Sequence, residues 1–271
     1  MFYNAKSGTL ELENGQMDYI CFGSGNRTLI MIPGLGDGLM TVKGKALPFA
    51  LMYRMYAKAY RVYVFSRGNE LPMGCTTHSM AEEVFAAMQQ LDIQTADVVG
   101  ISQGGMIAQH LAADHPEAVH CLVLVVTAAS AGETIRSCVS AWMDMAKRDA
   151  YTELMRDNLY KMYTAAYLKK NAWMLPAAGK FGKPKSYDRF LAMANACMTH
   201  DAQDRLEKIL APTLVIGGGE DRVIGSEAAT VLANGIPNAK LHVYPNLGHA
   251  LYEEAKDFND LVLSFLEDTK A

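Results

Sequence analysis

Six short runs rich in apolar residues recur along the chain, and two of them are nearly apolar throughout. They lie at residues 28–32, 61–66, 97–101, 121–126, 212–216 and 240–244. A continuous apolar run is typical of a strand buried on both faces, as in a parallel sheet. Segments of helical character follow most of the runs, at residues 45–60, 79–91, 103–114, 226–234 and 258–266. This alternation predicts an α/β fold with a mostly parallel sheet and helices on both faces.

Two local signals refine this pattern near the N-terminus. Asn14-Gly15 separates two strand-like runs at residues 9–12 and 17–22, and Asn-Gly in that setting favours a tight hairpin. We therefore expect an antiparallel hairpin at the edge of the sheet. Ser79 with Glu82 three residues later is a capping-box pattern, which predicts a helix that begins near Ser79.

The pattern changes between residues 132 and 205, where strand-like runs disappear and Met, Tyr and Trp are frequent. We expect pairs of helices in this segment, inserted into a core formed by residues 1–131 and 206–271. Most of its Met and aromatic side chains are expected to form the core of the insert. A few would line a pocket, since Met adapts to varied ligands, and we take Met143, Met162 and Trp173 as candidates.

The segment Gly100-Ile101-Ser102-Gln103-Gly104 is the first candidate for chemistry. A strand that turns sharply into a helix presents the central serine at the edge of the sheet, and the small residues allow the two elements to approach. The five-residue pattern alone also occurs by chance. Here an apolar strand precedes it and a helix of small residues follows, so Ser102 is the candidate nucleophile.

A serine nucleophile needs a base and a group that orients the base. Of the seven histidines, His249 alone lies in a Gly-His loop after the last predicted strand, so we assign it as the base. Asp221 follows the strand at 212–216 through three glycines and is the preferred acid. Glu220 is the alternative acid, and an Asp in such a loop could also serve only to form an Asx-turn.

Backbone N–H groups are the expected donors to an oxyanion. One is that of Gln103, the residue after the nucleophile, at the start of a helix whose dipole helps. The other belongs in the glycine-rich loop at residues 33–38, where Leu35 is the natural candidate.

Composition excludes several other classes of protein. The chain has 271 residues, 50% of them hydrophobic, and a net charge of −4. No basic surplus points to nucleic acid, and no apolar stretch is long enough to span a membrane. The five cysteines are widely spaced, with no C-x-x-C and no recognisable signal peptide. We therefore expect reduced thiols, no metal site and a cytoplasmic location.

Together these segments resemble the α/β-hydrolase superfamily, and within it a group of cap-bearing esterases, enol-lactonases and cofactor-free perhydrolases. The matching segments are residues 32–36, 66–68, 100–105, 212–221 and 248–249. The resemblance implies an eight-stranded, mostly parallel sheet and a helical cap after the sixth strand, where the insert falls. It implies no cofactor, and we expect a monomer or homodimer.

Three functions are compatible with this sequence. The main hypothesis is hydrolysis of a small, largely apolar carboxylic ester or lactone through an acyl-enzyme. C–C bond hydrolysis or perhydrolysis on the same triad is the second. The third is a receptor that retains the triad but senses a ligand with little turnover. Arg67, in a loop expected at the pocket mouth, would contact a charged substrate.

Overall fold

The computed structural model describes residues 2–13 and 15–269. Within them, eight strands form one sheet in the order β1-β2-β4-β3-β5-β6-β7-β8. The strands are β1 (Lys6–Leu12), β2 (Gly15–Phe22), β3 (Arg27–Ile32), β4 (Tyr60–Gly68), β5 (Ala96–Ile101), β6 (Val119–Val125), β7 (Thr213–Gly218) and β8 (Ala239–Tyr244). All pairs from β4 to β8 are parallel, whereas β1–β2 and β2–β4 are antiparallel. The predicted mostly parallel sheet is therefore confirmed.

The expected edge hairpin is present, with Leu12 paired to Gly15 across its end. Asn14, on which the prediction partly rested, lies outside the described residues. Strands β3, β5 and β6 form the centre of the sheet, and their side chains are almost entirely buried. Burial on both faces explains why these strands lack the alternation of a surface strand.

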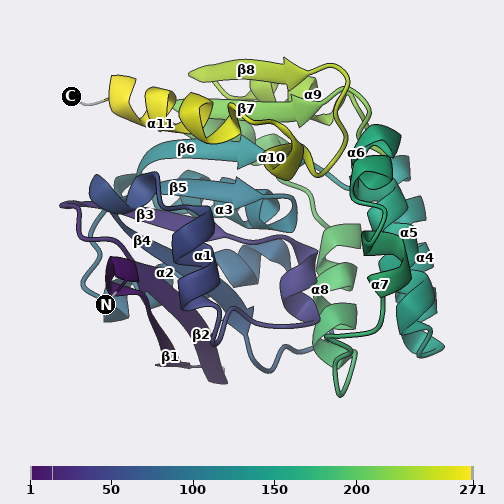
Figure 1. The fold of residues 1–271 in the computed structure, drawn as a ribbon. Coiled ribbons are helices and arrows are strands. Elements are labelled where there is room, and N and C mark those ends of the chain that lie inside the picture. The colour runs from purple at the N-terminus through teal and green to yellow at the C-terminus, as the bar shows by residue number, and fades with distance from the viewer. Residues whose placement is uncertain (1, 14, 270–271) are drawn as a thin grey trace.

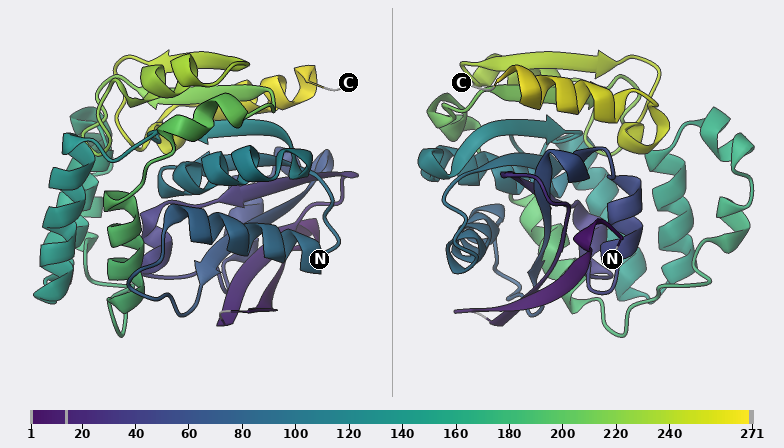
Figure 2. Two further views of the ribbon diagram at one scale, coloured as in Figure 1. Left: turned by 180° about the vertical axis from the view of Figure 1, so that it is seen from behind. Right: turned by 60° about the vertical axis from the view of Figure 1, so that its left-hand side comes forward.

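Helices cover both faces of the sheet, as Figures 1 and 2 show: α1 and α11 on one face, and α2, α3 and α9 on the other. The helices of this part are α1 (Ala46–Met52), α2 (Thr77–Gln90), α3 (Gln103–Asp114), α9 (Ala228–Gly235), α10 (Leu251–Glu254) and α11 (Phe258–Asp268). Short 3₁₀ helices are η1 (Phe2–Asn4), η2 (Leu35–Gly38), η3 (Tyr56–Lys58), η4 (Pro116–Ala118) and η5 (Gln203–Lys208).

Five further helices lie between β6 and β7 in the sequence and stand at the carboxyl ends of the parallel strands (Figure 1). They are α4 (Glu133–Lys147), α5 (Tyr151–Met162), α6 (Ala165–Lys170), α7 (Met174–Ala177) and α8 (Asp188–Met198). Buried side chains of this insert, such as Ile135, Phe190 and Met193, belong to the same hydrophobic cluster as the sheet. The insert therefore packs on the core through a shared interior.

Two local predictions need correction. The segment 45–60 is not one helix, because α1 ends at Met52 and only the short η3 follows. Leu51 and Met52 are exposed, so this segment has no single apolar face that would fix the length of a helix. Helix α2 is capped by Thr76, whose side chain accepts a hydrogen bond from the Ser79 N–H. The cap, and with it the start of the helix, thus lies three residues earlier than the Ser79 pattern indicated.

Among the described residues, no helix is both long enough and apolar enough to cross a bilayer.

Candidate active site

Ser102 lies at the turn between β5 and α3, with a φ of 55° and a ψ of −121°. Few non-glycine residues adopt this conformation, and such strain is often found at functional sites. The neighbouring glycines make the turn possible. A Cβ on Gly104 would lie 1.9 Å from the carbonyl oxygen of Ile32, and one on Gly100 would lie 2.6 Å from that of Gly104. Any larger residue at either position would separate α3 from the sheet.

The structure brings Ser102, His249 and Asp221 into one hydrogen-bonded chain. His249 Nε2 lies 2.9 Å from Ser102 Oγ, and His249 Nδ1 lies 2.7 Å from Asp221 Oδ2. The three residues follow β5, β7 and β8, whose carboxyl ends meet at one edge of the sheet. His249 is 3% exposed and Asp221 6%. An imidazole held between a hydroxyl and a buried carboxylate can accept a proton from the hydroxyl.

The Asp221 carboxylate is fixed by both of its oxygens. Oδ1 accepts hydrogen bonds from the N–H groups of Val223 (2.8 Å) and Ile224 (3.0 Å), which leaves Oδ2 for His249. The Asx-turn and the pairing with histidine, considered as alternatives from the sequence, therefore coexist. Glu220 is exposed, and its backbone N–H donates to the carbonyl of Leu247. The structure thus places Asp221, and not Glu220, beside the histidine.

Leu35 and Gln103 occupy the first positions of η2 and α3, where backbone N–H groups have no partner within the helix. In the part of the chain that the structure describes, neither N–H donates to a protein acceptor. Both groups are thus free to donate to a bound molecule. Leu35 also borders the cavity described next.

Ser102 and His249 line a cavity of about 410 Å³ beneath the insert. Its other walls come from the loop and helix after β3, from α4 and α5, and from α10. They are Pro33, Gly34, Leu35, Gly36, Asp37, Met40, Val42, Lys45, Phe49, Trp142, Met155, Asn158, Leu159, Met162, Tyr163, Tyr252 and Glu253. Apolar walls with a few polar groups are typical of small-molecule sites.

A second compartment of about 210 Å³ adjoins the first. The two share Leu35, Gly36, Met40, Lys45, Trp142, Met155 and Asn158. The second compartment adds Leu39, Tyr151, Leu154, Gly182 and Phe190, and neither Ser102 nor His249 lines it. It extends the space beside Ser102 along the interface between η2 and the insert.

Of the four predicted pocket residues, only Met162 lines the cavity. Arg67 is 0% exposed and binds Asp37 inside the core, so it cannot contact a substrate at the mouth. Trp173 is 69% exposed and lies outside both compartments. Met143 packs against the hydrophobic cluster, whereas its neighbour Trp142 faces the cavity. Successive helical residues point about 100° apart, so the prediction of Met143 chose the wrong face of α4.

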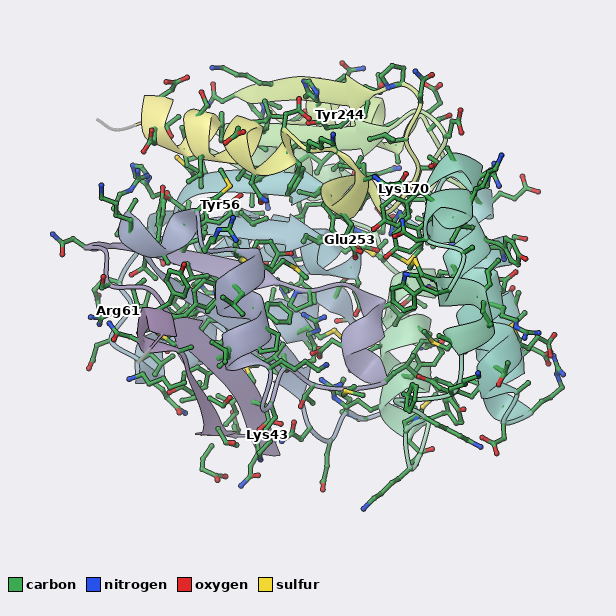
Figure 3. All side chains as sticks on the ribbon, in the orientation of Figure 1. Lys43, Tyr56, Arg61, Lys170, Tyr244 and Glu253 are labelled. Atoms are coloured by element: carbon green, nitrogen blue, oxygen red, sulfur yellow. The ribbon has the colours of Figure 1, made fainter. Side chains whose placement is uncertain are left out.

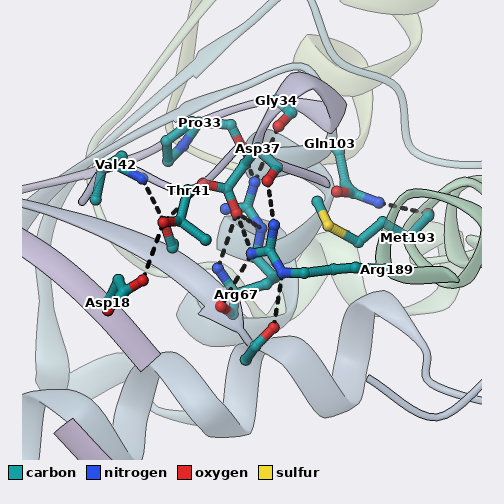
Figure 4. Close-up of polar contacts among 12 residues, drawn as sticks. Asp18, Pro33, Gly34, Asp37, Thr41, Val42, Arg67, Gln103, Arg189 and Met193 are labelled. Carbon is teal, nitrogen blue, oxygen red and sulfur yellow. Dashed lines mark hydrogen bonds and ion pairs between the residues drawn. The ribbon is translucent and has the colours of Figure 1, made fainter. Parts of the chain in front are cut away.

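Asp37, at the end of η2, is the centre of a buried polar network that fixes the glycine-rich loop (Figure 4). Its carboxylate accepts from Ser66 Oγ (2.7 Å), from the Arg67 N–H (3.1 Å) and from Arg189 Nη2 (2.5 Å). Burial alone would raise the pKa of Asp37, but the Arg67 and Arg189 guanidinium groups, together with the hydrogen bonds from Ser66 and the Arg67 N–H, outweigh it and lower the pKa. The carboxylate therefore stays ionised.

The loop is also held through its carbonyl groups. Arg67 Nη2 donates to the carbonyls of Pro33 (2.5 Å) and Gly34 (3.0 Å). Arg189, from α8 of the insert, donates to the carbonyls of Asp37, Arg67 and Gly68. These bonds fix the direction of the Leu35 N–H, because its neighbours on both sides are tied down.

Helix α8 also contacts the other candidate donor. The Gln103 side-chain amide donates to the carbonyl of Met193 (2.6 Å) and lies 3.1 Å from Cys197 Sγ. A Cβ on Gly38 would lie 2.8 Å from the Cα of Phe190, so η2 and α8 are in direct contact. One helix of the insert thus braces both sides of the space in front of Ser102.

At the junction of α10 and the insert, Glu253 lines the cavity (Figure 3). Its Oε2 accepts a hydrogen bond from the Tyr163 hydroxyl (2.7 Å). Burial raises the pKa of Glu253, and the bond from Tyr163 only partly offsets this effect. Burial also lowers the pKa of the Lys45 ammonium, the one lysine of the described cavity lining.

Two groups of side chains in the described residues could each supply three metal ligands: Asp97, His120 and Cys121, and His78, Glu82 and Asp114. Asp97 lies at the opposite end of β5 from Ser102, and Asp114 at the opposite end of α3. Arg27 already pairs with Asp97. Neither group can act on a molecule bound at Ser102, and the absence of a metal or cofactor from the chemistry stays a prediction.

Sequence reasoning missed Asp37, Lys45, Arg189 and Glu253. Asp37 lies in the glycine-rich loop already identified, and an acid in such a loop was a usable signal. The other three residues come from segments that the sequence does not connect to Ser102, and only the packing of α1, of the insert and of α10 brings them there.

A family model described as the alpha/beta hydrolase fold matches residues 27–256. A 2-hydroxy-6-oxononadienedioate/2-hydroxy-6-oxononatrienedioate hydrolase from Pseudomonas putida is 28% identical, over 98% of this chain and 96% of that protein. Among solved structures, the enol-lactonase from Burkholderia xenovorans LB400 has a TM-score of 0.81 at 22% identity, covering 96% of this chain and all of that one. The structure of Est816, described as an N-acyl homoserine lactone degrading enzyme, has a TM-score of 0.73 at 25% identity and covers 95% of this chain and 100% of its own.

Proposed function

Because the chain belongs to the α/β-hydrolase family, we propose that it is a serine hydrolase that cleaves a small, largely apolar carboxylic ester or lactone. Ser102 is the nucleophile, His249 the general base and Asp221 the residue that orients and stabilises the histidine. The observation that carries this proposal is the hydrogen-bonded chain from Ser102 through His249 to Asp221 at the wall of a largely apolar cavity.

In the proposed mechanism, His249 Nε2 accepts the Ser102 proton as Oγ attacks the substrate carbonyl. The N–H groups of Leu35 and Gln103 stabilise the resulting oxyanion, and losing one such donor typically costs about 3 kcal/mol. Protonated His249 then gives its proton to the leaving alkoxide, and an acyl-enzyme remains. Water, activated by His249, attacks the acyl carbonyl, and the acid product leaves with Ser102 restored.

Two observations support an ester or lactone as the substrate. Most of the cavity lining is apolar, with Phe49, Trp142, Met155, Leu159 and Met162 among its side chains. Est816, similar in structure at 25% identity, is described as degrading a lactone, which is an internal ester. We also propose that residues 132–205 act as a cap, since α4 and α5 supply much of the lining.

A second candidate is C–C bond hydrolysis on the same residues. The Pseudomonas putida relative is named for a hydroxy-oxo-dienedioate, a compound without an ester bond, so its hydrolysis cleaves a C–C bond. The same triad and donors could serve that reaction. Assaying 2-hydroxy-6-oxononadienedioate beside esters of similar size separates the two candidates by their kcat/KM values.

The test of the main proposal is turnover of p-nitrophenyl acetate and butyrate by the wild type and by Ser102→Ala. We expect many turnovers per wild-type molecule and a loss of at least about 10³-fold in the variant. If the wild type shows about one event per molecule while a ligand raises its Tm, the protein is a sensor. Turnover that requires peroxide would instead favour perhydrolysis.

A further inference from the structure

Lys45 is the only charged side chain among the described residues that line the second compartment. Its other walls are apolar, apart from Asn158, the Tyr151 phenol and backbone groups. The first compartment holds a carboxyl group at Glu253, but Glu253 does not line the second. The second compartment is therefore an apolar space with one positive charge.

Lys45 is not neutralised by the protein. Its ammonium donates to the carbonyl of Met40 at 3.3 Å, and among the described residues no carboxylate lies within ion-pair distance of it. The nearby Asp37 favours the charged form of Lys45 and Arg189 opposes it, but Asp37 is already paired with both Arg67 and Arg189. A partly desolvated cation that forms no ion pair within the protein gains from a bound anion.

The position of the compartment indicates which part of a substrate it would hold. Leu35 and Gly36 border both compartments, and Leu35 is the proposed donor to the acyl oxygen. The acyl group stays bound through both half-reactions, whereas the alcohol leaves after the first. A space next to the acyl oxygen, removed from Ser102, thus suits the distal end of the acyl chain.

We propose that Lys45 binds a carboxylate at the far end of the acyl group, so that the substrate is an ester or lactone of an acid with a second, distal carboxylate. This inference rests on the proposed function of Ser102. The apolar chain passes Trp142 and Met155, the scissile carbonyl lies at Ser102, and the distal carboxylate reaches the Lys45 ammonium. The enzyme thereby distinguishes a singly charged acyl chain from a neutral chain of the same length.

Matched pairs of esters test this recognition. The p-nitrophenyl monoesters of adipic and suberic acid are compared with p-nitrophenyl hexanoate and octanoate, which have the same chain lengths. We expect the wild type to prefer at least one of the carboxylate esters over its neutral partner by about tenfold or more in kcat/KM, the usual size of a charge-assisted hydrogen bond. Lys45→Met is expected to abolish that preference, mainly through KM, with a much smaller loss on the neutral ester.

Lys43→Met is the matched control. Lys43 lies two residues away but is exposed, lies 3.4 Å from Asp18 and points away from the insert (Figure 3). Its loss should leave the preference as in the wild type. A wild type without the preference, or equal losses on both esters in Lys45→Met, would overturn the proposal for Lys45 while leaving Ser102 hydrolysis intact.

A binding measurement keeps the two proposals separable. Calorimetric titration of monoethyl suberate into Ser102→Ala and into the double variant with Lys45→Met needs no turnover. We expect about tenfold weaker binding in the double variant. Equal affinities refute the role of Lys45 whatever the outcome at Ser102, and an inactive wild type with Lys45-dependent binding refutes only the hydrolase proposal.

Discussion

The Asp221 carboxylate makes two kinds of contact: Oδ1 accepts a hydrogen bond from the Val223 N–H within its own turn, and Oδ2 lies against His249 Nδ1. Asp221→Asn keeps an oxygen for the turn but offers the histidine an amide. We expect the kcat for p-nitrophenyl butyrate to fall by about 10⁴-fold, as in serine hydrolases that lose the carboxylate. Glu220→Gln, next to it and exposed, is the control and should keep kcat within about threefold. Similar losses in both variants would contradict the assignment.

Gly104 is required for a steric reason. An alanine Cβ would lie 1.9 Å from the Ile32 carbonyl, and backbone on both sides leaves no room to adjust. We expect Gly104→Ala to lower the free energy of unfolding by at least about 3 kcal/mol, the upper range for overpacking. At Gly74 an added Cβ would have no atom within 4 Å. Gly74→Ala should therefore change the free energy of unfolding by less than about 0.5 kcal/mol. Urea unfolding measures both, and a stable Gly104→Ala would refute the close approach.

Among single residues, the sequence predicted the three members of the triad well, but it predicted poorly which side chains face the cavity. Ser102, Asp221 and His249 could be placed together because each follows a strand, and parallel strands end at one edge. Arg67 follows a strand as well, but its side chain turns inward to Asp37. Position along the chain does not determine that direction, which depends on partners such as Asp37 and Arg189.

At the scale of elements, helix α8 connects the insert to the loop that carries Leu35. Arg189→Met removes the bonds from α8 to Asp37 and to three backbone carbonyls. Removing one partner of a buried ion pair costs about 3–5 kcal/mol. We expect the free energy of unfolding to fall by about 3 kcal/mol, at the lower end of this range, because Arg67 still pairs with Asp37. We also expect kcat to fall at least tenfold with a smaller change in KM, because the Leu35 donor is needed most in the transition state.

The control for this prediction is Arg148→Met, which removes exposed ion pairs with Asp144 and Glu153 elsewhere in the insert. It should leave the urea midpoint and kcat unchanged. A folded Arg189→Met enzyme with wild-type kcat would show that α8 does not position the loop.

The positions of the strands along the chain followed from the apolar pattern, which is strong where strands are buried on both faces. The ends of helices followed less well. The prediction of a single helix over 45–60 was wrong. The predicted cap of α2 was also wrong, because Thr76, Ser79 and Glu82 offer overlapping capping patterns. How α8 packs on η2 has no sequence signal, because it depends on contacts between residues about 150 positions apart.

At the scale of the whole molecule, two buried histidines link folding to pH. Burial, with the nearby charges of His78 and Arg205, lowers the pKa of His110 to about 4 against the opposing effect of Asp114 and Asp201. Burial and His110 likewise lower that of His200 to about 3. The unfolded chain binds these protons near pH 6.5 and the folded one does not, so stability is fully present above pH 6.5 and falls as pH decreases toward 4.

We expect His110→Leu to weaken this dependence by up to about 1.4 kcal/mol per pH unit between about pH 6 and 4.5. The leucine also removes a buried Nδ1 that has no partner among the described residues. Urea unfolding at several pH values measures the two slopes. Parallel curves for wild type and variant would exclude His110 as a source of acid sensitivity.

The cytoplasmic location and the monomeric or dimeric state stay predictions.

The proposed mechanism requires Ser102 to be an activated nucleophile, and covalent labelling detects such a group. The wild-type protein is incubated with a fluorophosphonate, and the modified peptide is identified by mass spectrometry. We predict one adduct, on Ser102, that forms much more slowly in Asp221→Asn and not at all in Ser102→Ala. A wild-type protein that forms no adduct, or one modified at another serine while Ser102 stays free, would show that Ser102 is not the nucleophile.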